Sequence, residues 1–171
     1  MLKRFLRFGL IAPVLALALL PDAVSADSGL AGSVGTTGTR ASLGVLVPVT
    51  VTCPAPSSDP SVSQSVFGTL TLIQANGNSK VAVGAATLAS GGKGAFGSPQ
   101  PGVNLTCDGN SHTYQALVLP DTQTDPFTAA ITGGKATANL TLTLFNFTCP
   151  PCFAPTTTTV TSGPVEIHVK G

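Results

Sequence analysis

The sequence predicts an all-β fold, and three observations lead to this prediction. Apolar residues recur at every second position in several short segments, which is the period of a half-buried strand. Clusters of Gly, Asn, Asp and Pro separate these segments as turns. After the N-terminal stretch, no segment has the pattern of an amphipathic helix. Seven or eight short strands at this spacing are typical of an antiparallel β-sandwich of immunoglobulin-like type.

The clearest strand is GVLVPVTVTC at residues 44–53. Its alternate residues from Val45 to Cys53 share one apolar face, and Pro48 on the other face indicates an edge strand or a bulge. Similar runs predict further strands at residues 66–74, 80–86, 102–107, 113–119, 127–132, 136–148 and 164–170.

One of these runs changes parity. Leu140, Leu142 and Leu144 share one face, but Phe145 and Phe147 continue the apolar series on the other. We expect a β-bulge near Leu144-Phe145, or a strand that leaves one sheet for the other there, either of which would keep both series inside; the alternative is a strand that is covered on both faces.

The first 26 residues are typical of a secretory signal. Three basic residues precede a short apolar stretch at residues 8–20, and the small residues Val24-Ser25-Ala26 predict cleavage after Ala26. The mature chain is then residues 27–171, a single domain with a flexible N-terminal segment to about residue 40. We expect a secreted, extracellular protein with no stable membrane span in the mature chain. Three asparagines stand in the Asn-x-Thr glycosylation pattern, which a eukaryotic host would use: Asn104, Asn139 and Asn146.

The charge of the chain is too sparse for a nucleic-acid-binding protein. The full sequence has eight basic and seven acidic residues. Three basic residues and one acidic residue lie in the signal, which leaves five and six. No basic stripe is therefore available to neutralise phosphates, and we expect no nucleic-acid partner.

The chain has four cysteines, of which two end inward-facing series. Cys53 ends the series from Val45, and Cys107 ends the series of Val103 and Leu105. Because both sulfurs should enter the same core, we predict a Cys53–Cys107 disulfide, which the chain-entropy model values at roughly 4 kcal/mol. Cys149 and Cys152 remain for each other, although four cysteines allow three connectivities.

The stretch Cys149-Pro150-Pro151-Cys152 raises a separate question. Extended Pro-Pro geometry would hold the two Cα atoms about 9 Å apart, too far for a disulfide. A tight or cis turn would allow a local staple, which we expect; otherwise the two thiols face different partners. A redox centre is disfavoured because the prolines remove two amides that would stabilise a thiolate.

Catalytic and metal-binding patterns are missing from the sequence. It contains no Gly-x-Ser-x-Gly motif and no obvious pair of catalytic acids, so we expect no enzyme and no cofactor. The group of Asp108, His112 and Tyr114 is better explained as a hairpin turn with an inward tyrosine whose hydroxyl finds a backbone partner. His112 and His168 lack the spacing of metal ligands, and His168 should face outward.

Several stretches together resemble a family of small secreted bacterial domains of unknown function. The resemblance covers nearly all of the mature chain and implies an exported immunoglobulin-like sandwich without an assigned activity. A fainter similarity to the chromophore-binding neocarzinostatin-type apoproteins rests on size, export and β-rich character, although the cysteine spacings differ. The stretches that carry the main resemblance are VTVTCP (49–54), LTLIQANGNSKVAVG (70–84), VNLTCDGNSHTYQALVLPD (103–121), GGKATANLTL (133–142) and PVEIHVK (164–170).

The functional hypothesis from the sequence is a secreted, non-enzymatic binding or structural module. Its partner would be an extracellular or cell-surface protein or glycan. Two alternatives are a protease inhibitor that presents the loop 149–155 and a carrier of a small ligand. The candidate interaction residues of that loop are Pro150, Pro151, Phe153 and Pro155.

Overall fold

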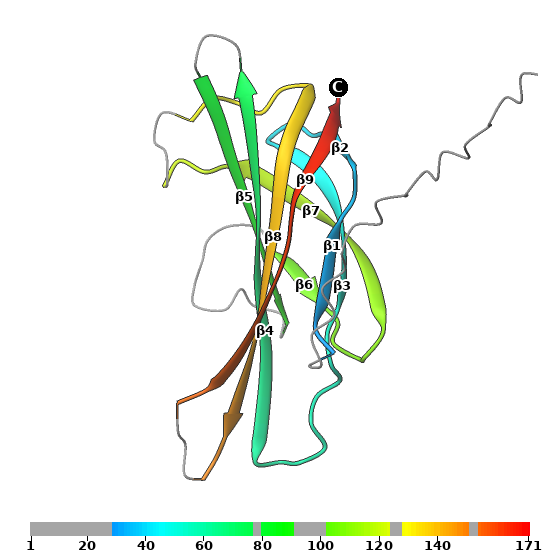
Figure 1. Ribbon diagram of the computed structural model, residues 1–171, viewed down its shortest axis with the longest axis vertical. Coiled ribbons are helices and arrows are strands. Elements are labelled where there is room, and N and C mark those ends of the chain that lie inside the picture. The colour runs from blue at the N-terminus through cyan, green and yellow to red at the C-terminus, as the bar shows by residue number, and fades with distance from the viewer. Residues whose placement is uncertain (1–28, 77–79, 91–101, 124–127, 151–153) are drawn as a thin grey trace, which may run out of the picture.

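The computed structural model describes residues 29–76, 80–90, 102–123, 128–150 and 154–171 (Figure 1). The signal segment therefore lies outside the described residues. Within them the chain forms strands and no helix. The strands are β1 (Ala31–Val34), β2 (Thr37–Arg40), β3 (Val45–Thr52), β4 (Val62–Asn76), β5 (Lys80–Ser90), β6 (Val103–Leu105), β7 (Ser111–Pro120), β8 (Gly134–Thr148) and β9 (Thr156–Lys170).

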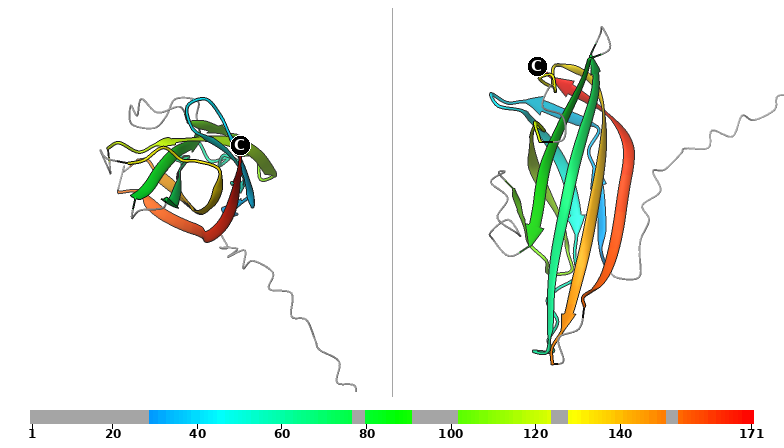
Figure 2. Two further views of the ribbon diagram at one scale, coloured as in Figure 1. Left: turned by 90° about the horizontal axis from the view of Figure 1, so that it is seen from above. Right: turned by 90° about the vertical axis from the view of Figure 1, so that its left-hand side faces the viewer.

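Seven of these strands close into a β-barrel, so the predicted immunoglobulin-like sandwich is wrong. The strands follow one another around the barrel as β3, β2, β9, β8, β4, β5 and β7, and β7 pairs again with β3. Viewed end-on, they surround one interior (Figure 2).

Two short seams close the barrel. In one, residues 37–39 of β2 pair in parallel with residues 168–170 of β9. In the other, residues 84–85 of β5 pair with residues 119–120 of β7. A sandwich would leave these edges unpaired. The alternation of apolar residues is the same in both architectures, because each has one inner face, and therefore could not distinguish them.

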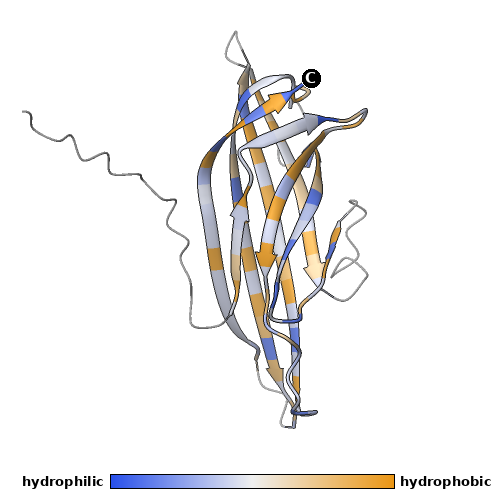
Figure 3. Ribbon diagram, turned by 90° about the vertical axis from the view of Figure 1, so that its right-hand side faces the viewer, coloured by the Kyte–Doolittle hydropathy of each residue, from blue (hydrophilic) through white to orange (hydrophobic). Residues whose placement is uncertain are grey.

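The interior is filled by the alternate residues that the sequence pattern identifies. In β3, Val45, Val47, Val49 and Val51 are fully or almost fully buried, and Cys53 continues the series. The same banding of apolar and polar residues runs along the other strands (Figure 3). These side chains form one hydrophobic core inside the barrel.

Within the N-terminal segment to about residue 40, which we expected to be flexible, residues 31–34 form β1 and residues 37–40 form β2. β1 pairs with the second half of β3, and β2 pairs with its first half. A Cβ atom on Gly32 would lie 2.7 Å from the Leu142 side chain, so β1 lies directly on the core. These strands lack the alternation of large apolar residues that predicts a strand, because Gly and Thr occupy several of their positions.

The strand predicted at residues 127–132 is also wrong for the described residues 128–132, which form a loop without ladder pairing. Side chains hold this loop instead. Thr128 Oγ1 accepts a hydrogen bond from Val83 N at 2.7 Å and donates one to Val83 O at 3.1 Å. Gln74 binds the backbone of Thr132 in a similar way. Ile131, which lies between them, is buried in the core.

The change of parity in β8 has another explanation than the predicted bulge. Leu140, Leu142 and Leu144 are buried, whereas Phe145 is half-buried and Phe147 is 37% exposed on the outer face. The register irregularity lies earlier, between Ala138 and Leu140 in the pairing of β8 with β9. The two phenylalanines therefore lie on the outside of the barrel and do not enter its core.

The longest strands continue past the closed part of the barrel. β4, β8 and β9 each contain 15 residues, and they project together at the lower end (Figure 1). β9 begins at Thr156, eight residues before the predicted start at Pro164. Of the projecting strands, β4 and β8 provide one wall of the candidate site.

Candidate functional site

A cavity of about 370 Å³ lies at the end of the barrel where β5 changes partner. β5 pairs with β7 only through Gly84 and Ala85, and its last residues 88–90 pair in parallel with the short strand β6. The barrel wall is therefore replaced at this end by β6 and by the segment that follows β3. The described residues that line the cavity are Pro54, Pro56, Gln64, Ser65, Val66, Ser90, Leu105, Cys107 and Leu144.

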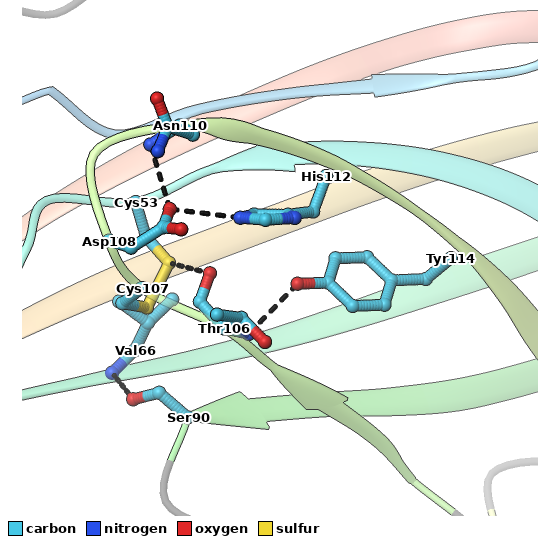
Figure 4. Close-up of a disulfide and its surroundings, with 9 residues drawn as sticks. All are labelled: Cys53, Val66, Ser90, Thr106, Cys107, Asp108, Asn110, His112 and Tyr114. Carbon is cyan, nitrogen blue, oxygen red and sulfur yellow. Dashed lines mark hydrogen bonds and ion pairs between the residues drawn. A yellow bond between two sulfur atoms is a disulfide. The ribbon is translucent and has the colours of Figure 1, made fainter.

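The disulfide between Cys53 and Cys107 fixes this replacement wall, and it confirms the predicted pairing. It joins the end of β3 to the residues after β6, with a Cα–Cα distance of 4.8 Å. Two hydrogen bonds hold the same segment. Gly109 N donates to Cys53 O at 3.0 Å. Thr106 N donates to Tyr114 Oη at 2.8 Å, as Figure 4 shows. The expectation that the tyrosine hydroxyl finds a backbone partner is thus confirmed.

The opposite wall is held by a contact between a side chain and the backbone. The ladder between β4 and β5 ends at Phe67 and Ala89. Beyond it, Val66 N donates a hydrogen bond to Ser90 Oγ at 2.8 Å. Figure 4 shows this contact beside the disulfide. Because the hydroxyl oxygen accepts this bond, its own hydrogen is left to donate elsewhere.

Gln64 is a polar residue of the cavity lining. Its Nε2 donates to Oδ1 of Asn146, the residue opposite it on β8, at 2.8 Å. Its Oε1 is buried and has no hydrogen-bond partner. A buried carbonyl oxygen without a partner costs roughly 1–3 kcal/mol, so native proteins seldom keep one without a reason.

Besides Gln64, Ser65 and Ser90, the described lining residues are apolar, and none of these lining residues carries an ionisable group, since Cys107 is in a disulfide. A charged molecule would lose its hydration there without gaining a counter-charge. The volume lies within the roughly 300–1,000 Å³ of small-molecule sites. The arrangement is therefore suited to holding a neutral molecule.

The group of Asp108, His112 and Tyr114 lies outside this cavity. Asp108 Oδ1 accepts a hydrogen bond from Asn110 N at 2.9 Å and lies 2.9 Å from His112 Nε2. The Asn110 amide, followed by the His112 ring, lowers the pKa of the exposed Asp108 carboxyl to about 2. The predicted turn is present, but it does not join a hairpin, because β6 pairs with β5 and β7 pairs with β3.

No group of three His, Cys, Asp or Glu side chains gathers as a metal site in the part of the chain that the structure describes. His168 is exposed on β9, as predicted, with Glu166 and Lys170 on the same side.

The candidate interaction loop is described in part. Pro150 and Pro155 are exposed, whereas Pro151, Cys152 and Phe153 lie outside the described residues. Cys149 is disulfide-bonded, and its backbone N–H donates to Ser61 O at 2.8 Å. The described residues of this loop do not line the cavity.

Comparison with protein-family models, with curated proteins and with solved structures gives no match for this chain. Among the described residues, no helix has the length and apolar character needed to cross a membrane. Function is therefore inferred from the geometry of the chain itself.

Sequence reasoning missed most of the cavity residues. Gln64 precedes the strand predicted from residue 66, and Ser90 follows the one predicted to end at residue 86. The sequence does contain a signal for Gln64. It has the same parity as the inward residues Val66, Gly68 and Leu70, so a polar side chain stands where the pattern predicts an apolar one. Nothing in the sequence indicates that β6 replaces β7 beside it.

Proposed function

We propose that this protein is an exported, non-enzymatic binding module that holds a small neutral molecule in the cavity at the lower end of its barrel. The observation that carries this proposal is the cavity itself: about 370 Å³, lined mainly by apolar residues and without ionisable groups among the described lining residues. The Cys53–Cys107 disulfide is compatible with an oxidising, extracellular compartment and supports export. Of the sequence hypotheses, the small-ligand carrier gains most from this geometry.

A rigid site suits a carrier because little ordering entropy is lost on binding. The disulfide, the bond from Thr106 N to Tyr114 Oη and the bond from Val66 N to Ser90 Oγ all fix cavity walls before a ligand arrives. We assign no catalytic role to these groups.

The test is a screen of neutral, apolar fragments against the oxidised protein by saturation-transfer NMR, with thermal unfolding as a second readout. We expect several fragments to bind and to raise the unfolding midpoint. Leu144→Trp, which places a larger side chain in the cavity lining, should abolish both signals. Leu43→Trp is the matched control, because Leu43 is 72% exposed and lies away from the cavity. If no fragment binds the wild-type protein, or if Leu144→Trp binds as well as Leu43→Trp, the proposal is wrong.

A further inference from the structure

We infer that the cavity binds a peptide segment in extended conformation, which adds as a short strand beside β4 and pairs its main chain with that of Gln64. The segment is uncharged and places an apolar side chain in the cavity. This inference rests on the proposed function and names the chemistry of the ligand. It is carried by the position of the cavity along the edge of β4 and by the backbone groups of that edge.

The cavity lies along the edge of β4 and not on one of its faces. Its lining includes three consecutive residues of this strand, Gln64, Ser65 and Val66, together with Ser90 at the end of β5. Successive side chains of a strand point to opposite faces, so a cavity on one face would contact only alternate residues. β4 extends past the end of β5 as far as Val62. The cavity therefore lies where a longer β5 would continue beside β4.

The hydrogen bonds of β4 show which of its backbone groups face this position. Cys149 N donates to Ser61 O at 2.8 Å, in line with the register of β4 and β8. Because bonded and non-bonded pairs alternate along an antiparallel ladder, the odd-numbered residues here bond to β8 and the even-numbered ones face the opposite edge. The bond from Val66 N to Ser90 Oγ agrees with this alternation. The backbone N–H and C=O of Gln64 therefore face the side on which β5 has ended.

Two of the three N–H groups along this edge already have acceptors within the chain. Val62 N donates to Asp59 O at 3.0 Å, and Val66 N donates to Ser90 Oγ at 2.8 Å. Between them, the backbone N–H and C=O of Gln64 have no hydrogen-bond partner in the part of the chain that the structure describes. An unpaired strand edge is a template for pairing with another chain. Gln64 thus offers one donor and one acceptor to an added strand.

This arrangement defines the residue that would bind opposite Gln64. In an antiparallel bonded pair, its N–H donates to Gln64 O and its C=O accepts from Gln64 N. Its side chain then lies on the same face as the Gln64 side chain, which is the inward face of Val66. Leu105 and Leu144 line the cavity there, so an apolar side chain fits. A charged one would lose its hydration without a counter-charge from the described lining residues. Strand addition of this kind is an established mode of peptide recognition.

Four probes separate the main chain from the side chain. Three are tripeptides with an acetylated N-terminus and an amidated C-terminus: Ala-Val-Ala, the same peptide with an N-methylated valine, and Ala-Lys-Ala. Thymol, a small apolar alcohol without a peptide group, tests the cavity alone. By isothermal titration calorimetry, we expect the oxidised wild-type protein to bind Ala-Val-Ala about tenfold more tightly than either of the other peptides, because N-methylation removes the donor to Gln64 O and lysine introduces a charge. Thymol should bind as well, since it needs only the apolar lining.

Two substitutions at one position assign the effect to the backbone. Gln64→Pro removes the N–H that faces the cavity and no ladder bond to β8, a place in a strand where proline is tolerated. Gln64→Ala is the matched control, because it loses the same side chain and keeps the N–H. We expect Gln64→Pro to bind Ala-Val-Ala about tenfold more weakly than Gln64→Ala, and both variants to bind thymol equally. Circular dichroism and the unfolding midpoint check that each variant is folded.

Hydrogen exchange measured by NMR on the wild-type protein gives a test that needs no variant. Bound Ala-Val-Ala should slow the exchange of the Gln64 amide, because that amide gains an acceptor. The amides of Val62 and Val66 already donate within the chain, so their exchange should change much less.

The outcomes separate this inference from the proposed function. If the N-methylated peptide binds as tightly as Ala-Val-Ala, if Gln64→Pro binds the peptide as well as Gln64→Ala, or if exchange of the Gln64 amide is not slowed, strand addition is wrong. Binding of thymol without binding of any peptide also refutes it and leaves the cavity as a site for other neutral molecules. If neither the peptides nor thymol bind, and the fragment screen is also negative, the proposed function and this inference fail together.

Discussion

The side-chain amide of Gln74 forms hydrogen bonds with both the backbone N–H and the backbone carbonyl of Thr132. Thr132 N donates to Gln74 Oε1 at 2.8 Å, and Gln74 Nε2 donates to Thr132 O at 3.0 Å. Gln74 is 2% exposed. Among the residues that the structure describes, it is the polar residue that is buried. Its amide therefore provides the donor and the acceptor that a residue of a neighbouring strand would provide. These two bonds hold the loop that contains the buried Ile131.

Gln74→Leu should lower the free energy of unfolding by roughly 1–3 kcal/mol, because both polar groups of Thr132 lose their partner. Gln115→Leu, on an exposed position, should change it by less than about 0.5 kcal/mol. Urea denaturation followed by circular dichroism measures both changes. Equal stability of the two variants would show that the loop does not depend on Gln74.

The Cys53–Cys107 disulfide should be a major contributor to stability. It joins residues 54 apart in sequence, for which the chain-entropy model gives roughly 4 kcal/mol. We expect a double serine substitution to lower the free energy of unfolding by about 2–5 kcal/mol. Non-reducing peptide mapping of the wild type should recover the two cysteines in one linked pair. A link from Cys53 to Cys149 or Cys152 would contradict the fold described above.

Gly84 should be sensitive to any side chain, because it lies in the seam between β5 and β7. A Cβ atom there would lie 2.6 Å from Ile131 Cδ1 and 2.7 Å from Val118 Cγ1. Gly84→Ala should therefore cost about 1–3 kcal/mol of stability through overpacking. At Gly133 the nearest atom would be 3.6 Å away, so Gly133→Ala serves as the control. A neutral effect at Gly84 would argue against the closed seam.

Asp108 should make stability depend on pH in acid. Its folded pKa is lowered to about 2 by the Asn110 amide and the His112 ring, whereas an unfolded aspartate has a pKa of about 3.9. The contribution is therefore present above about pH 4 and is lost as the pH falls to about 2. The urea midpoints of wild type and Asp108→Asn should differ at neutral pH and converge near pH 2. A constant difference across this range would exclude the carboxylate as the cause.

Much of the barrel interior was predictable from the sequence, because inward residues such as Val45 and Leu142 repeat at period two. The phase of Cys53 and Cys107 also predicted their disulfide correctly. Closure was not predictable. It depends on two short seams, of three residue pairs that begin at Thr37 and two pairs at Gly84 and Ala85, and the apolar repeat of a strand does not specify which strand it pairs with. The loop at residues 128–132 was mistaken for a strand because Gln74 and Thr128 provide hydrogen bonds that a neighbouring strand would otherwise provide.

The candidate site was less predictable than the core. Its apolar residues have the pattern of ordinary core positions, and its polar residues Gln64, Ser65 and Ser90 lie outside the predicted strands. The cavity arises because β6, which has only three residues, stands beside β5 where a longer strand would have filled the wall. Such a gap depends on the spatial order of the strands, which local periodicity does not report.

The central claim, that the lower cavity is the binding site, is tested most directly by methyl NMR of the oxidised protein during titration with thymol. Bound thymol should shift the methyl resonances of Val66, Leu105 and Leu144, which line the cavity, and leave those of Leu43 and Ile131 unchanged. Leu43 and Ile131 line a smaller cavity of about 90 Å³ at the other end of β3. Saturable shifts confined to the first set are the predicted result. Shifts confined to Leu43 and Ile131, or no saturable shifts at all, would contradict the claim.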